Sequence, residues 1–80
     1  MSRLKGLSWR DIERALRKAG FKPAPTRGKG SHLAYCRMLE GEEKRLVIVP
    51  RKKDIPVGTV HAIVKQAGLS VQKFIDLLNS

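Results

Sequence analysis

The residues with the clearest capacity for chemistry lie in the segment TRGKGSHLAY, residues 26–35. Two glycines flank a lysine, an arginine stands before them, and Ser31 and His32 come directly before the expected start of a strand. Glycines let backbone amides approach a phosphate closely, and Arg27 and Lys29 would hold that phosphate. This pattern would place His32 beside a phosphate group, with an imidazole that exchanges a proton near neutral pH.

A single histidine is enough for phosphodiester chemistry when the substrate brings its own nucleophile. RNA does so, because its 2′-hydroxyl lies next to the scissile phosphate. A base that removes the hydroxyl proton, with cations that stabilise the added charge, completes a minimal catalyst. DNA has no such hydroxyl, so a metal-free site built on His32 favours RNA. The residues alone leave a second interpretation open, in which His32 is a capping or packing residue at a strand end.

Other chemistries have less support in the sequence. His32 and Cys36 are four residues apart on the expected strand, too far to share a zinc ion. The chain has no acidic pair suited to a two-metal nuclease, and no nucleophile elbow for a hydrolase triad. We therefore expect neither a metal nor a cofactor. Cys36, the lone cysteine, is expected to be a small core residue in a reducing compartment, and His61 a surface residue of a helix.

The charge of the chain favours a polyanionic partner. Seventeen Lys and Arg residues stand against seven Asp and Glu residues, which gives 80 residues a net charge of +10. No acid occurs between Arg14 and Leu39, the interval that contains His32. The N-terminus has no apolar signal-peptide region and no run approaches a transmembrane span, so we expect a cytoplasmic protein without membrane contact.

The expected elements follow the order α-β-β-β-α, with a terminal helical turn or two. A capping box of Ser8 and Asp11 begins a first helix, which ends at Gly20. Because an edge strand tolerates the missing N–H donors of prolines, residues 21–26, which contain two of them, are expected to form an edge strand. Residues 31–39 and 44–50 are expected to form an antiparallel hairpin. A second helix is expected from Thr59 to Ala67, and Ser70 caps a last one whose inward residues would be Val71, Phe74, Ile75 and Leu78. The fold class is α+β, a three-stranded antiparallel sheet with helices on one face.

The face of the middle strand is a separate expectation. Ala34, Cys36 and Met38 share one face and carry no charge, so we expect this face to turn toward the helices. Tyr35 would then face outward, where it stacks on a base or is a plain surface residue. Trp9 lies on the apolar stripe of the first helix and is expected in the core. The segment RKKD, residues 51–54, is either a solvated loop or a second phosphate contact.

The chain resembles the HicA family of small toxins over essentially its whole length. LRKAGF, then GSH at the start of a strand, then VPRKKDIPVGTVHAIVKQAGLS carry the resemblance, and the spacing between them makes it specific. The resemblance implies one HicA-like domain over residues 1–80, with a fold like a double-stranded-RNA-binding domain. It also implies an mRNA interferase neutralised by a HicB-type antitoxin, with His32 as the catalytic residue.

One departure from the family bears on mechanism. Many members carry a second histidine where this chain has Lys52, and lysine is a poor proton shuttle near neutral pH unless it is buried. We expect a metal-independent endoribonuclease of a type II toxin–antitoxin system, with His32 as base. Its phosphate-binding residues would be Arg27, Lys29, Gly30, Ser31, Arg51, Lys52 and Lys53. The alternative is a non-catalytic RNA-binding module, because this fold and charge suffice for backbone recognition.

Overall fold

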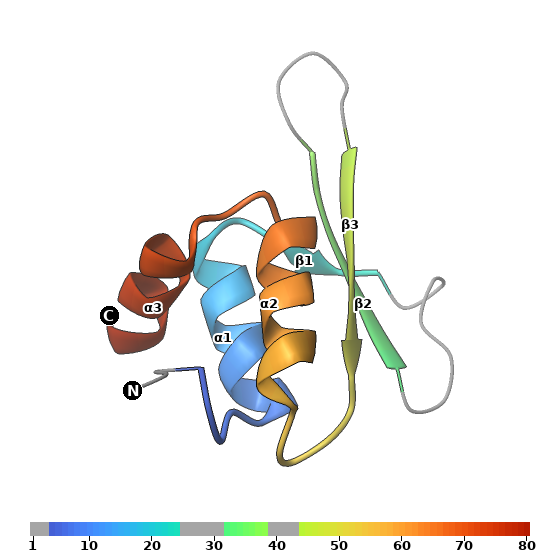
Figure 1. Cartoon of the computed structure of the whole chain (residues 1–80). Coiled ribbons are helices and arrows are strands. Elements are labelled where there is room, and N and C mark those ends of the chain that lie inside the picture. The colour runs from blue at the N-terminus through green and yellow to red at the C-terminus, as the bar shows by residue number, and fades with distance from the viewer. Residues whose placement is uncertain (1–3, 25–31, 39–43) are drawn as a thin grey trace.

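A computed structural model describes residues 4–24, 32–38 and 44–80 (Figure 1). The elements follow the order α1 (Trp9–Lys18), β1 (Lys22–Pro23), β2 (His32–Met38), β3 (Lys44–Pro50), α2 (Val57–Gln66) and α3 (Val71–Asn79). The three strands form one antiparallel sheet in the order β1-β2-β3. All three helices lie on the same side of this sheet (Figure 1). The expected α+β class, the element order and the three-stranded antiparallel sheet are therefore confirmed.

Helix α1 begins and ends where its local chemistry dictates. The Ser8 hydroxyl accepts a hydrogen bond from the Asp11 amide at 3.3 Å, and the Asp11 carboxylate accepts one from the Ser8 amide at 2.9 Å. This capping box satisfies two amides that the first turn cannot pair internally. At the other end Gly20 has φ +95°, a left-handed conformation that glycine adopts without a Cβ penalty. Ile12, Ala15 and Leu16 form the buried stripe.

The middle strand turns the face opposite to the expected one toward the helices. Tyr35 is 2% exposed, and its hydroxyl donates a hydrogen bond to Glu13 of α1. Arg37 on the same face donates to the Ala19 carbonyl at the end of α1, at 2.8 Å. His32 and Met38 on the other face are exposed, Cys36 is partly exposed, and the small Ala34 is buried. The expectations that Tyr35 faces outward and that Cys36 is a core residue were wrong.

Strand β3 supplies the matching residues of the helix-covered face. Val47 pairs with Tyr35, and Val49 pairs with Leu33, and both valines are fully buried. Because alternate residues of a strand point to opposite faces, Leu46 and Pro50 lie on the same open face as His32. The outer edge of β3 is partly covered by α2, since the Gln66 side chain accepts a hydrogen bond from the Ile48 amide at 3.3 Å.

Helix α2 begins two residues earlier than expected. Pro56 already has φ −55°, and its carbonyl accepts the Val60 amide at 3.0 Å, so the helix starts at Val57 rather than Thr59. Val60, Ile63 and Val64 are buried as expected. Beyond the helix Gly68 has φ +73°, and a Cβ there would lie 2.7 Å from the Arg45 guanidinium. The left-handed backbone conformation therefore favours glycine, whereas the flexible end of the Arg45 side chain can move away from a Cβ.

Helix α3 packs against α1 and closes the core. The Ser70 hydroxyl caps it by accepting the Lys73 amide at 3.0 Å, as expected. Phe74 and Leu77 are buried, whereas Val71 is 39% exposed and does not face inward as expected. No helix in the described residues is long and apolar enough to cross a membrane.

Candidate nucleic-acid interface

His32 is the first residue of β2 and lies on the open face of the sheet. It is exposed, and its cross-strand partner is Pro50, the last residue of β3. The start of β2, the end of β3 and the beginnings of α1 and α2 lie at one end of the molecule (Figure 1). A large ligand can therefore reach the imidazole, and the segment after Pro50 leaves the sheet directly beside it.

That segment, Arg51–Asp54, is held by backbone hydrogen bonds. The Lys52 amide donates to the Pro50 carbonyl, and the Lys52 carbonyl accepts the Trp9 amide, both at 2.9 Å. The Ile55 amide then donates to the Leu7 carbonyl at 2.8 Å. These backbone hydrogen bonds thus fix the loop against the N-terminus of α1.

The side chains of this loop make the end of the sheet electropositive. Arg51, Lys52 and Lys53 are all exposed, and Asp54 is the one acid of the four residues. The N-terminal ends of α1 and α2, the positive ends of their dipoles, lie at this same end (Figure 1). Cationic side chains and helix dipoles together favour binding of phosphate groups near His32.

Trp9 lies beside this loop and is only partly buried. The Arg10 guanidinium carbon lies 5.3 Å from the centroid of the indole ring, and that of Arg51 lies 5.4 Å from it. Both distances fall within the range of cation–π attraction. The sequence placed Trp9 on the inward stripe of α1. The sequence did not predict that Arg10 and Arg51 would both lie beside the indole ring, because Arg51 is far from Trp9 along the chain.

Tyr35 is no base-stacking residue, because its ring is buried between β2 and α1. Burial, and then the hydrogen bond and negative charge of Glu13, raise the pKa of the Tyr35 phenol far above its ordinary value. Its role is to join the sheet to α1.

The other predicted residues fall into two groups. Arg27, Lys29, Gly30 and Ser31 lie outside the described residues, so their predicted roles stay predictions. His61 is exposed on α2, as expected. Within the described residues, no three His, Cys, Asp or Glu side chains are grouped so that they would hold a metal ion.

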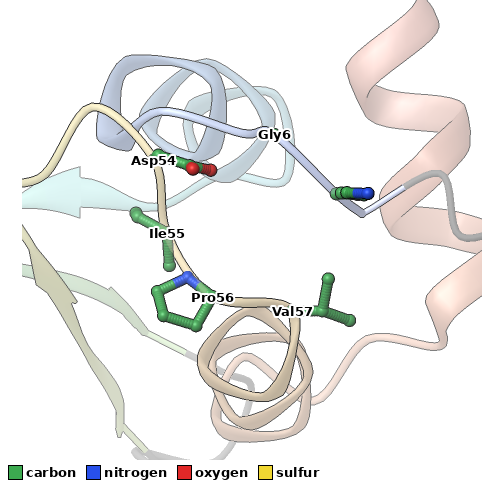
Figure 2. Close-up of a pocket in the computed structure, with 6 residues that line it drawn as sticks. Gly6, Asp54, Ile55, Pro56 and Val57 are labelled. Atoms are coloured by element: carbon green, nitrogen blue, oxygen red, sulfur yellow. The ribbon is translucent and has the colours of Figure 1, made fainter.

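A shallow hollow of about 280 Å³ lies between the N-terminal segment and the start of α2 (Figure 2). It is lined by Lys5, Gly6, Asp54, Ile55, Pro56 and Val57. His32 is not among the lining residues. The hollow is too small and too apolar to hold a polynucleotide, so the exposed surface around His32 is the candidate site.

The arrangement defines a small α+β domain with a basic sheet end and an exposed histidine. A family model described as the HicA toxin of bacterial toxin–antitoxin matches residues 9–69, from the first residue of α1 to just beyond α2. The match covers more than half of the chain and includes His32 and the Arg51–Asp54 loop. This chain belongs to the HicA toxin family. A search of curated proteins found no match.

Proposed function

We propose that this toxin is a metal-independent endoribonuclease that cleaves mRNA in the cytoplasm, with His32 as its general base. The observation that carries the proposal is the exposed position of His32 on the open sheet face, next to the strand end from which Arg51, Lys52 and Lys53 emerge. A proton acceptor and phosphate-binding cations are the two parts that cleavage of RNA by its own 2′-hydroxyl requires.

The proposed reaction starts at the 2′-hydroxyl beside the scissile phosphate. The His32 imidazole takes the hydroxyl proton, and the 2′-oxygen forms a bond to phosphorus while the bond from phosphorus to the 5′-oxygen breaks. The products are a 2′,3′-cyclic phosphate and a 5′-hydroxyl whose proton comes from water or from a protonated side chain. The loop cations stabilise the negative charge that develops on the phosphate oxygens.

We propose two further features of this function. A HicB-type antitoxin neutralises the toxin by covering the open sheet face, where exposed Met38 and Leu46 offer apolar contacts on the same side as His32. Residues 1–80 act as one HicA-like domain, because α3 is joined to α1 by Lys18, whose ammonium donates to the Leu77 carbonyl at 3.3 Å.

The experiment that tests the proposal compares the wild type with His32→Ala on a long mixed-sequence RNA in the presence of a chelator. Removing a general base lowers cleavage by about 10²–10⁴-fold. His61→Ala is the matched control, because His61 is the other histidine of the chain and is also exposed. We expect fragments from the wild type and from His61→Ala, and intact RNA with His32→Ala.

Binding is measured on the same samples by gel retardation. RNA should still bind His32→Ala, because cationic residues supply most of the affinity for a polyanion. Retarded but intact RNA with all three proteins would refute the nuclease proposal and support the RNA-binding module instead. Cleavage by His32→Ala at the wild-type rate would refute the role of His32.

A further inference from the structure

Trp9 and Arg10, which the proposed catalytic step does not use, form a cluster with Arg51, one of the loop cations. Trp9 and Arg10 are the first two residues of α1, and Arg51 is the first residue after β3. Both guanidinium carbons lie within 5.4 Å of the indole centroid. The backbone bond from the Trp9 amide to the Lys52 carbonyl fixes the two elements against one another. The cluster therefore has a defined position relative to the sheet.

The guanidinium groups of this cluster differ from those of the other described arginines. Arg37 and Arg45 donate to the carbonyls of Ala19 and Gln66. Arg14 and Arg17 are paired with the carboxylates of Asp11 and Glu13. Within the described part of the chain, Arg10 and Arg51 have no such acceptor, and their recorded contact is the indole ring. Their N–H groups are thus available to a ligand.

Contact with an aromatic ring prepares a guanidinium for phosphate binding. It orients the planar group through its face, and the N–H donors along the edge remain free to bind two oxygens of one phosphate. It also restricts a side chain that would otherwise lose considerable rotamer entropy on binding. Two cations on one ring without a carboxylate partner repel each other, and a phosphate anion between or beside them relieves that repulsion.

We propose that Trp9, Arg10 and Arg51 form a second RNA-binding site, which holds a backbone phosphate one or two nucleotides from the bond beside His32. Arg51 directly follows Pro50, the cross-strand partner of His32, so an RNA strand that crosses the end of the sheet contacts both sites. Arg10 and Trp9 are positioning residues that fix the register of the strand. The inference rests on the proposed function for its ligand, RNA, but not on the catalytic role of His32.

The test uses wild-type protein and a labelled 2′-O-methyl RNA of mixed sequence, which the proposed reaction cannot cleave. Trp9 is the one tryptophan of the chain, so its fluorescence reports on this cluster alone. We expect Trp9 emission to change on titration with the same midpoint as the anisotropy of the RNA. Saturable binding of the RNA without a change in Trp9 emission would overturn the proposal. Because no cleavage is measured, failure of the nuclease proposal does not affect this result.

Charge-removing variants give the second measurement. Arg10→Gln and Arg51→Gln remove one cluster cation each, and Arg17→Gln is the matched control on the same helix, where an exposed ion pair contributes little to stability. For a single strand, the loss of one phosphate contact reduces the slope of log K against log salt concentration by about 0.7. At about 50 mM salt this corresponds to an about eightfold weaker affinity. We expect this loss for the two cluster variants and not for Arg17→Gln. Equal losses for all three would mean a diffuse charge effect and would overturn the proposal.

Discussion

The hydrogen bond between Tyr35 and Glu13 gives a stability prediction with a defined pH dependence. Tyr35→Phe keeps the buried ring but removes the hydroxyl that donates to Glu13. A hydrogen bond to a charged group contributes about 1.5–3 kcal/mol, and we take the lower part of that range because the Glu13 side chain is 28% exposed and water can reach it. We expect Tyr35→Phe to lower the free energy of unfolding by about 1.5–2 kcal/mol near pH 8.

The difference should shrink in alkaline solution. Burial and the Glu13 interaction raise the pKa of the Tyr35 phenol in the folded protein, whereas an unfolded chain loses the phenol proton near about pH 10. Above that pH the unfolded state binds fewer protons than the folded state, so the wild type loses stability by up to about 1.4 kcal/mol per pH unit. Tyr35→Phe has no phenol and escapes this loss, so the two stabilities converge as the pH rises from about 10 to 11.

Urea unfolding of both proteins at pH 8, 10 and 11, followed by circular dichroism, measures the difference. Lysine titration in the same range is common to both proteins and cancels. Because Tyr35 is the one tyrosine of the chain, ultraviolet absorbance also reports its ionisation directly. A stability difference that is constant across this range would refute the assignment of the raised pKa. Equal stabilities at pH 8 would refute the contribution of the hydrogen bond.

Three further predictions concern catalysis, packing and the partner. Lys52→His should raise the rate of RNA cleavage about tenfold or more near neutral pH, because imidazole is the better proton donor and the backbone hydrogen bonds of residue 52 keep its main chain in place. Single-turnover cleavage measures this rate, and an unchanged rate would contradict the prediction. Arg37→Ala should lower the free energy of unfolding, measured in urea, by about 1–2 kcal/mol. The reason is that Arg37 donates to the Ala19 carbonyl and its guanidinium carbon lies 5.4 Å from the Phe21 ring centroid. Arg37→Lys should lower the free energy of unfolding by less. Raising salt should slow association of a HicB-type antitoxin more than its dissociation, as stopped-flow mixing would measure; a flat on-rate would mean that the basic end is not the docking surface.

Local chemistry was enough to place most element ends. The Ser8 and Asp11 capping box, the Ser70 cap, and the left-handed glycines at 20 and 68 act within a few residues of chain, so the sequence alone predicts them. The start of α2 was predicted two residues too late, because the helix begins after Pro56 without a side-chain capping hydrogen bond. Val71 was placed inward in error, and buried Leu77 was missed, because a nine-residue helix contains too few turns to define one stripe.

The orientation of β2 was beyond local reasoning. Both faces of the strand carry apolar residues, so alternation does not distinguish them, and the charge of Arg37 suggested that its face was outward. In the fold Arg37 reaches the Ala19 carbonyl at the end of α1, so a charged side chain lies on the helix-covered face with a partner. That partner is distant along the chain. The correction places His32 on the open face of the sheet.

The sequence by itself determined the kind of elements, the basic charge, the family and the identity of the candidate histidine. These properties depend on residue types and short spacings. Tertiary structure alone decided which face His32 occupies and that Arg10 and Arg51 share the Trp9 ring. The physical reason is that both depend on contacts between α1, β2 and the loop after β3. Such contacts are fixed by how the helices cover the sheet, and no short stretch of the chain contains them.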